Sequence, residues 1–206
     1  SVKAQGALFP VLDVRTKQLQ LVGKAWKGLP LIPELLGTKA PLKGELLVSG
    51  PSLSPRLQLV LNQHNNPLLE HWSLQADWSS DQGLLSLNRF NSPQLDADAV
   101  LPLQVGKAGL QVGALQSNVR LRAYPLSRVG FLLGTVMDGT VAAAGEIRGP
   151  LQSLQPDLQI EVNSPRAGAI RLVESWKGRF EGRPGGGGQL QMASVGAVIP
   201  GSLRAQ

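Results

Sequence analysis

The chain lacks cysteine and has little of several residue types on which catalytic and metal sites depend. Its 206 residues include no Cys, only two His, 4% aromatic residues and 17% charged residues. Without Cys there is no disulfide framework, no thiol nucleophile and no Cys-based zinc site. The two histidines, His64 and His71, leave little room for a histidine metal cluster or a histidine acid–base pair.

Long apolar runs are missing too. The longest apolar stretch, from Val129 to Val136, is interrupted by Gly130 and Gly134. A membrane-spanning helix needs about 20 apolar residues. The first five residues do not have the charged, apolar and cleavage regions of a signal peptide in order. Because the chain begins and ends inside a repeating pattern, we expect a piece of a longer protein.

Turn-forming residues are abundant. The chain has 24 Gly and 15 Pro, and 42% of its residues are hydrophobic. This composition excludes disorder caused by low hydrophobicity. It argues against a helical protein and predicts many short strands separated by turns.

One pattern occurs twice and begins a third time. Ala7-Leu8-Phe9-Pro10 recurs at residues 99–102 and again at residues 197–200. In the same order, Leu53–Leu61 matches Leu154–Val162, and Gly83, Leu85 and Leu87 match Gly188, Leu190 and Met192. A fixed interval of this kind indicates repeated structural units. We predict a first β unit at residues 1–98, a second at 99–196, and the opening strand of a third at 197–206.

Most segments alternate apolar and polar residues, which predicts strands with one dry face and one wet face. In one segment Leu158, Ile160 and Val162 alternate with Gln159 and Glu161. Such alternation favours antiparallel sheet over a sheet covered on both faces. Each unit is expected to add one short helix, weakly at Leu31–Leu36 and more clearly from Pro125 to Gly134, where proline and glycine suit the two helix ends.

Two architectures fit an alternating pattern: a closed sandwich or barrel for each unit, or one open sheet. Helical material to cover the dry face is scarce. The second unit also carries six extra residues between Gly145 and Pro156 yet keeps its strand phase, as stacked repeats do. We therefore expect an all-β fold in which an extended antiparallel sheet curls into a half-pipe with two short helices.

Several strings resemble the C-terminal repeat region of TamB-like proteins, especially their cyanobacterial and chloroplast branch. They are Tyr124-Pro125-Leu126-Ser127-Arg128, Gly139-Thr140-Val141 running to Gly149-Pro150-Leu151, Trp176-Lys177-Gly178-Arg179-Phe180, and Ala197-Val198-Ile199-Pro200-Gly201. The resemblance covers nearly the whole chain, but it consists of diffuse strand patterning without an invariant catalytic signature. The first unit departs from it at Lys27–Pro33 and lacks the tyrosine.

The resemblance implies a β-taco, a long half-pipe with an apolar lumen that crosses the periplasm. It implies an inner-membrane anchor outside this segment and an Omp85-class barrel in the outer membrane as partner. The implied role is transport of phospholipid between the two membranes. The alternative is a scaffold or chaperone for outer-membrane protein assembly or envelope translocation, offering an open sheet edge to a partner strand.

The groove-lining residues expected from the alternation are apolar and recur in both units. In the first unit they are Leu46, Val48, Leu53, Leu57, Leu59, Leu61, Trp72, Leu74, Ala76, Trp78, Leu85 and Leu87. In the second they are Leu115, Val119, Leu121, Val141, Ala143, Leu154, Leu158, Ile160, Val162, Ile170, Leu172, Trp176, Phe180, Leu190 and Met192. By themselves these residues fit a self-packed core as well as a conduit, and the resemblance favours the conduit.

Other chemistry has little support in the sequence. No Gly-x-Ser-x-Gly, His-Glu-x-x-His or phosphate-cradling loop occurs, so we expect neither an enzyme nor a cofactor. Asp96 and Asp98 would suit Ca²⁺ only with a third carboxylate, which is not near in sequence. The net charge of +6 makes nucleic-acid binding a hypothesis to consider. The scattered basic residues and the few aromatics favour weak contact with anionic headgroups instead.

Overall fold

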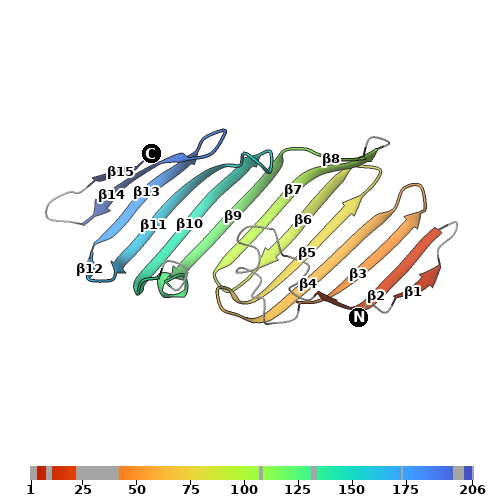
Figure 1. Cartoon of the computed structure of the whole chain (residues 1–206), viewed down its shortest axis with the longest axis horizontal. Helices are drawn as coiled ribbons and strands as arrows, with labels where there is room; N and C mark the ends of the chain where they lie inside the picture. The colour runs from red at the N-terminus through yellow and green to blue at the C-terminus, as the bar shows by residue number, and fades with distance from the viewer. Residues whose placement is uncertain are drawn as a thin grey trace. The chain divides into compact units, whose positions relative to one another are not determined.

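The structure is a computed structural model, and it is built almost wholly from antiparallel strands (Figure 1). It describes residues 4–7, 11–21, 42–106, 109–130, 134–172, 174–196 and 202–205. The strands are β1 (Ala4–Ala7), β2 (Val11–Leu21), β3 (Leu42–Pro51), β4 (Arg56–Asn66), β5 (Glu70–Ser79), β6 (Leu84–Asn91), β7 (Leu95–Gly106), β8 (Gly109–Val112), β9 (Leu115–Pro125), β10 (Met137–Gly149), β11 (Gln155–Ala167), β12 (Ile170–Arg171), β13 (Ser175–Gly182), β14 (Gly188–Val195) and β15 (Ser202–Ala205).

Neighbours in the chain are, with two exceptions, neighbours in an open antiparallel sheet. The strand order is β1-β2-β3-β4-β5-β6-β7-β9-β10-β11-β13-β14-β15, while β8 pairs with β7 and β12 pairs with β11. Short turns permit this arrangement because hairpins need only a few residues. The open, antiparallel, all-β class expected from the alternation is confirmed.

The chain divides into two compact units, and strand β7 contributes to both. Unit 1 consists of Ser1–Pro93 and Asp98–Gly113, and unit 2 of Gln94–Ala97 and Ala114–Gln206. The repeat boundary expected between residues 98 and 99 therefore falls inside β7. The hairpin of β7 and β8, which opens the second sequence repeat, packs with unit 1.

The two units repeat the same cross-strand register. In unit 1, Leu57 lies opposite Trp78, and Trp78 opposite Leu85. In unit 2, the matching residues Leu158, Phe180 and Leu190 are paired in the same way. Directly opposed residues share a face of the sheet, so the similarity between the two sequence units extends to their three-dimensional pairing.

The expected helix from Pro125 to Gly134 is wrong. The chain forms only a three-residue 3-10 turn, Leu126–Arg128, and no α-helix occurs among the described residues. The tight turn has a physical reason: Gly130 and Gly134 lie close together in this segment, and glycine weakens a helix by about 1 kcal/mol. The weaker expectation at Leu31–Leu36 lies outside the described residues. Within the described part of the chain, no helix is long and apolar enough to cross a membrane.

Unit 1 has a small local core at one end of strands β3, β4 and β5. Its apolar members are exposed by 7% or less and are Leu42, Leu61, Leu68, Leu69 and Trp72. The indole of Trp72 stacks on Phe90 with ring centroids 5.5 Å apart. At this end of unit 1, apolar side chains pack on one another.

Buried hydrogen bonds hold the turn that completes this core. Gln63 Oε1 accepts hydrogen bonds from Trp72 Nε1 (2.8 Å) and from Asn66 Nδ2 (2.9 Å). Asn66 Oδ1 accepts from the backbone N–H groups of Leu68 and Leu69, each at 2.9 Å. An asparagine that bonds the backbone two and three residues onward fixes a tight turn. The turn in this way places two leucines against the sheet.

Replacing Gln63 by Ala is expected to destabilise unit 1. The change removes the acceptor of two buried donors, and each buried donor without a partner costs about 1–3 kcal/mol. Urea unfolding followed by circular dichroism should show a loss of roughly 2–4 kcal/mol. The matched control is Gln58→Ala, an exposed glutamine on the same strand; equal losses for the two variants would contradict the role given to Gln63.

Candidate functional site

The candidate site is the apolar face of unit 2, which spans strands β9, β10, β11, β13 and β14. Cross-strand pairing aligns its side chains in rows that run from strand to strand. The first row is Tyr124, Val141, Val162, Trp176 and Ser194; the second is Leu121, Ala143, Ile160, Gly178 and Met192; the third is Val119, Gly145, Leu158, Phe180 and Leu190. None of the residues in these rows is charged.

Most of this apolar face is only half-buried. Of the residues in the three rows, Tyr124 alone is buried, with 7% of its surface exposed, and the rest are of intermediate exposure. In an ordinary core, side chains are enclosed by close-packed neighbours on all sides. The described residues of unit 2 thus provide no second layer that covers this face.

Glycine interrupts the larger side chains of the second and third rows. Gly178 lies between Ile160 and Met192, and a Cβ at that position would collide with the backbone oxygen of Gln191. Gly145 lies between Val119 and Leu158 in the same manner. Glycines beside bulky neighbours leave the large side chains free to spread over the backbone. The result is a shallow apolar surface with no single deep pocket formed by these rows.

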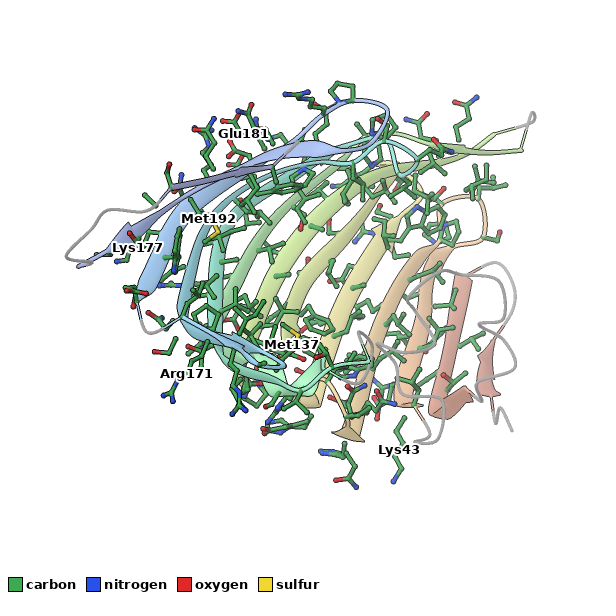
Figure 2. All side chains as sticks on the ribbon, turned by 60° about the vertical axis from the view of Figure 1, so that its left-hand side comes forward. Lys43, Met137, Arg171, Lys177, Glu181 and Met192 are labelled. Carbon is green, nitrogen blue, oxygen red and sulfur yellow. The ribbon has the colours of Figure 1, made fainter. Side chains whose placement is uncertain are left out.

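The opposite face of unit 2 is polar and charged. Lys177 and Glu181 lie on this polar face and Met192 on the apolar one (Figure 2). The pattern follows from strand geometry, because successive side chains point to opposite sides. Cross-strand pairing keeps the two kinds of residue apart over neighbouring strands.

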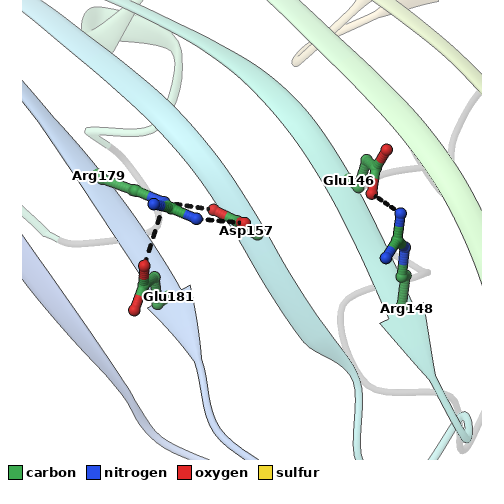
Figure 3. A network of polar contacts seen from close by, with 5 residues as sticks. All are labelled: Glu146, Arg148, Asp157, Arg179 and Glu181. Carbon is green, nitrogen blue, oxygen red and sulfur yellow. Dashed lines mark hydrogen bonds and ion pairs between the residues drawn. The ribbon is translucent and has the colours of Figure 1, made fainter.

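Ion pairs on the polar face connect the strands (Figure 3). Arg179 binds both carboxylate oxygens of Asp157, at 2.7 and 2.6 Å, and its Nε lies 3.2 Å from Glu181. These hydrogen bonds from Arg179 lower the pKa of the Asp157 carboxyl below its usual value. Asp157 and Glu181 lie opposite each other in the ladder, so Arg179 offsets the repulsion between two like charges.

Two further pairs extend this pattern. Lys177 Nζ lies 3.4 Å from Glu161 on the neighbouring strand, and Arg148 pairs with Glu146 two residues earlier on β10. All of these groups are at least partly exposed, and exposed pairs contribute little stability each. These pairs affect which ligands the polar face could bind, because much of its positive charge is already neutralised by neighbouring carboxylates.

A hollow of about 470 Å³ also lies on the polar face. It forms where Ala142 and Ala144 stand among longer side chains, including Arg120, Gln159 and Lys177. A smaller hollow of about 220 Å³ occupies the polar face of unit 1 beside Arg56 and Asp77. Both hollows are shallow and open.

Unit 1 has an apolar face built on the same principle. Leu46, Leu59, Ala76 and Leu87 form one row, and Val48, Leu57, Trp78 and Leu85 form the next. Trp78 remains half-buried and its Nε1 donates to the carbonyl of Leu103 at 2.9 Å. Leu61 and Leu74 pair one row further on, where Leu61 joins the local core. Apart from Leu53, the predicted groove residues of this unit therefore share one face, but one end of that face packs on itself.

Five predicted groove residues lie at strand ends or in turns, outside the rows named above. Leu53 is 94% exposed in the turn between β3 and β4, outside the strand rows. Leu154 precedes β11 and is 38% exposed. Ile170 and Leu172 lie in and just after the short strand β12, with exposures of 70% and 38%. Leu115, at the start of β9, is half-buried opposite Gly149.

The sequence pattern missed Tyr124 as a member of the apolar face. The pairing of β9 with β10 shifts register between Val141 and Ala143, and Ala123 adopts a left-handed φ of 38°. This irregularity places Tyr124 in line with Val141, three residues from Leu121 instead of two or four. Leu68 and Leu69 were missed for a different reason, because they belong to a turn without alternation.

Candidate metal and acid–base residues are not brought together. Among the described residues, no group of three or more His, Cys, Asp or Glu side chains could hold a metal ion. Asp96 forms an ion pair with Arg122. His64 and His71 are both exposed near the turn between β4 and β5.

Comparisons with protein-family models, curated proteins and solved structures find no match for this chain.

The single tyrosine of the chain provides a direct probe of the apolar face. Burial raises the pKa of Tyr124 above its usual value of about 10. The phenolate absorbance of the folded protein should therefore titrate at higher pH than that of the urea-unfolded chain. Because the folded state holds the phenol proton more tightly, stability should fall as pH rises above about 10. Equal titration midpoints in the two states would contradict burial of Tyr124.

Proposed function

We propose that this chain is a segment of a TamB-like bridge whose apolar face carries the acyl chains of phospholipids between the inner and outer membranes. The observation that carries the proposal is the half-buried apolar face of unit 2, which the described residues leave uncovered. Soluble proteins rarely leave a contiguous apolar surface of this kind without a use for it. An acyl chain is a ligand with the matching chemistry.

The energetic argument concerns the methylene groups of the cargo. Each methylene that passes from hydrocarbon into water costs about 0.8 kcal/mol, so a whole acyl chain costs on the order of 10 kcal/mol. A surface of Leu, Val, Ile and Phe side chains removes much of this cost along the path. The proposed half-pipe would hide the chain from bulk water without a separate lid.

Transport further requires that no point along the path hold the cargo tightly. The rows of unit 2 support this requirement, because glycine and alanine interrupt the larger side chains and no row residue is charged. Aliphatic contacts are also non-directional, so a chain can slide between equivalent positions. The polar face has no comparable property, because its ion pairs are fixed in direction.

The rest of the assignment follows from the resemblance to TamB-like proteins. We propose a periplasmic location, a membrane anchor in a segment outside this chain, and an Omp85-class outer-membrane barrel as the partner of the full-length protein. Nucleic acid is a poor candidate partner. The cations at Arg148, Lys177 and Arg179 already face carboxylates, which weakens attraction to a phosphate backbone.

One observation favours the second candidate, a scaffold that binds a partner strand. The hairpin of β7 and β8 carries Val105, Leu110 and Val112 with exposures of 69%, 60% and 47%. Leu103 pairs with Val112 and Val105 with Leu110, so these side chains share one face. Among the described strands, β8 pairs only with β7, and a free strand edge beside apolar side chains is a template for strand addition.

Photo-crosslinking tests the conduit. A photoreactive residue at Leu158 or Trp176 of the full-length protein should form adducts with phospholipid in cells, because both positions lie on the apolar face. The matched control is Gln159, which follows Leu158 on the same strand and lies on the polar face. Lipid adducts of equal yield at Leu158 and Gln159 would contradict a groove on the apolar side.

A charge on the apolar face should block the cargo. Leu158→Asp is expected to abolish lipid adducts at Trp176 and lipid transport, because an acyl chain would have to pass a carboxylate. The half-buried position limits the loss of stability to roughly 1–3 kcal/mol, which urea unfolding can measure. Gln159→Asp provides the control for charge alone. Normal transport by a folded Leu158→Asp protein would remove the mechanism.

The scaffold makes the opposite prediction about where binding is lost. Leu110→Lys with Val112→Lys places two charges on the exposed ribbon of β8 and should prevent strand addition. If the chain is a scaffold, this double variant loses peptide binding while Leu158→Asp retains it. If it is a conduit, the double variant keeps its lipid adducts at Leu158.

A further inference from the structure

Two neighbouring segments at one end of the strands of unit 2 form a distinct surface, which we call the arginine rim. It consists of residues 134–138, which lead into β10, and residues 165–172, which join β11 to β12. The N–H of Gly168 donates to the carbonyl of Val136 at 2.9 Å. The N–H of Leu172 donates to the carbonyl of Pro165, also at 2.9 Å, and closes the β11–β12 turn. The rim is therefore one hydrogen-bonded body.

Apolar side chains are unusually exposed on this rim. Val136 is 68% exposed, Ile170 70% and Leu172 38%. A single exposed apolar residue is common in soluble proteins and needs no explanation. Here three of them belong to two segments joined by hydrogen bonds, and a cluster of this kind marks a surface that another apolar medium covers.

Two arginines of the rim face each other across the β11–β12 ladder. Arg166 lies directly opposite Arg171, and like charges in that position repel. Asp138 lies 3.6 Å from Arg166, whereas no ion-pair partner of Arg171 is found among the described residues. An anion that both guanidinium groups can bind would relieve this repulsion, and phosphate matches their planar, two-pronged geometry.

The paired apolar and charged residues of the rim lie on two faces. Met137, Ala167 and Ile170 are aligned by the pairing on one face, while Asp138, Arg166 and Arg171 are aligned on the other. Arg171 projects away from the ribbon at this end of the strands (Figure 2). An element with one apolar and one basic face is typical of peptides that lie in a membrane interface.

The charge at this end of the strands is positive overall. The arginines are Arg128, Arg166 and Arg171, and the carboxylates are Asp138 and Glu174. An excess of arginine beside exposed apolar groups complements an anionic lipid headgroup layer better than a protein surface of mixed charge. Long arginine side chains can also reach phosphates while their stems lie on apolar groups.

We propose that the arginine rim docks on the surface of a bilayer containing anionic phospholipid. Val136, Ile170 and Leu172 enter the boundary between headgroups and acyl chains, and Arg166 and Arg171 bind headgroup phosphates. The inference rests on the proposed function only in taking membranes to be the source of the cargo. It adds a surface by which the wall of the conduit contacts a membrane directly.

Vesicle flotation with the whole chain tests the basic half of the rim. The protein should float with vesicles of phosphatidylcholine and phosphatidylglycerol, and much less with phosphatidylcholine alone. Arg166→Gln with Arg171→Gln should weaken binding to the anionic vesicles roughly 10- to 30-fold, because each cation near such a surface contributes substantially. The control, Arg120→Gln with Arg183→Gln, has the same net charge as the rim variant. It should bind the anionic vesicles as tightly as the unchanged protein does.

A second pair of variants tests the apolar half. Val136→Ser with Ile170→Ser should weaken binding to the same vesicles about tenfold or more, since two exposed side chains no longer enter the interface. Leu151→Ser is the matched control, because Leu151 is 50% exposed in the turn after β10. Circular dichroism of each variant verifies that the sheet is intact.

The outcomes separate this proposal from its alternatives. Binding of inorganic phosphate by a protein that does not float with the anionic vesicles would identify a free-phosphate site and overturn lipid docking. Equal weakening by the Arg120/Arg183 control would show non-specific charge and would also overturn it. If the rim variants no longer float with anionic vesicles but keep their lipid adducts at Leu158, the rim is supported. If the protein floats normally but forms no lipid adducts at Leu158, the conduit alone is contradicted.

Discussion

The structure depends on one constraint: the cross-strand register aligns the apolar rows of neighbouring strands on the same face. Strand side chains alternate with a period of two, so a slip of one residue in any ladder would place charges on the apolar face. Leu158, Phe180 and Leu190 form a continuous row only because three successive strands agree in phase. On the polar face, the same register places Arg179 where it donates two hydrogen bonds to the carboxylate of Asp157.

The two units use this arrangement differently. In unit 1, the turn held by Gln63 and Asn66 packs two leucines beside Trp72, so part of the apolar face is a self-filled core. In unit 2, the described residues supply no equivalent plug, and Tyr124 alone is buried on its rows. A sheet that buries so little of its apolar face gains less from folding than a closed sandwich does. Unit 2 therefore carries the stronger indication of a ligand surface.

Much of this fold could be predicted from the sequence, because alternation and repetition are both encoded locally. The pairing of Leu57 with Trp78 and of Leu158 with Phe180 follows from matched segments with the same phase. What failed depends on geometry that a period of two does not contain. The left-handed Ala123 moves Tyr124 onto the apolar face, and an asparagine turn, not a strand, buries Leu68.

The same reasoning explains why the apolar face could be foreseen but its use could not. An alternating strand is equally consistent with a packed core and an open groove, and only the burial of particular residues distinguishes them. Leu61 has 7% of its surface exposed, whereas its counterpart Val162 remains half-buried in the same position of the repeat. The two units therefore share the same strand register but differ in what packs on the apolar face. The difference lies in the turns, because the turn held by Asn66 buries Leu68 and Leu69 against the apolar face of unit 1, and no described turn does the same in unit 2.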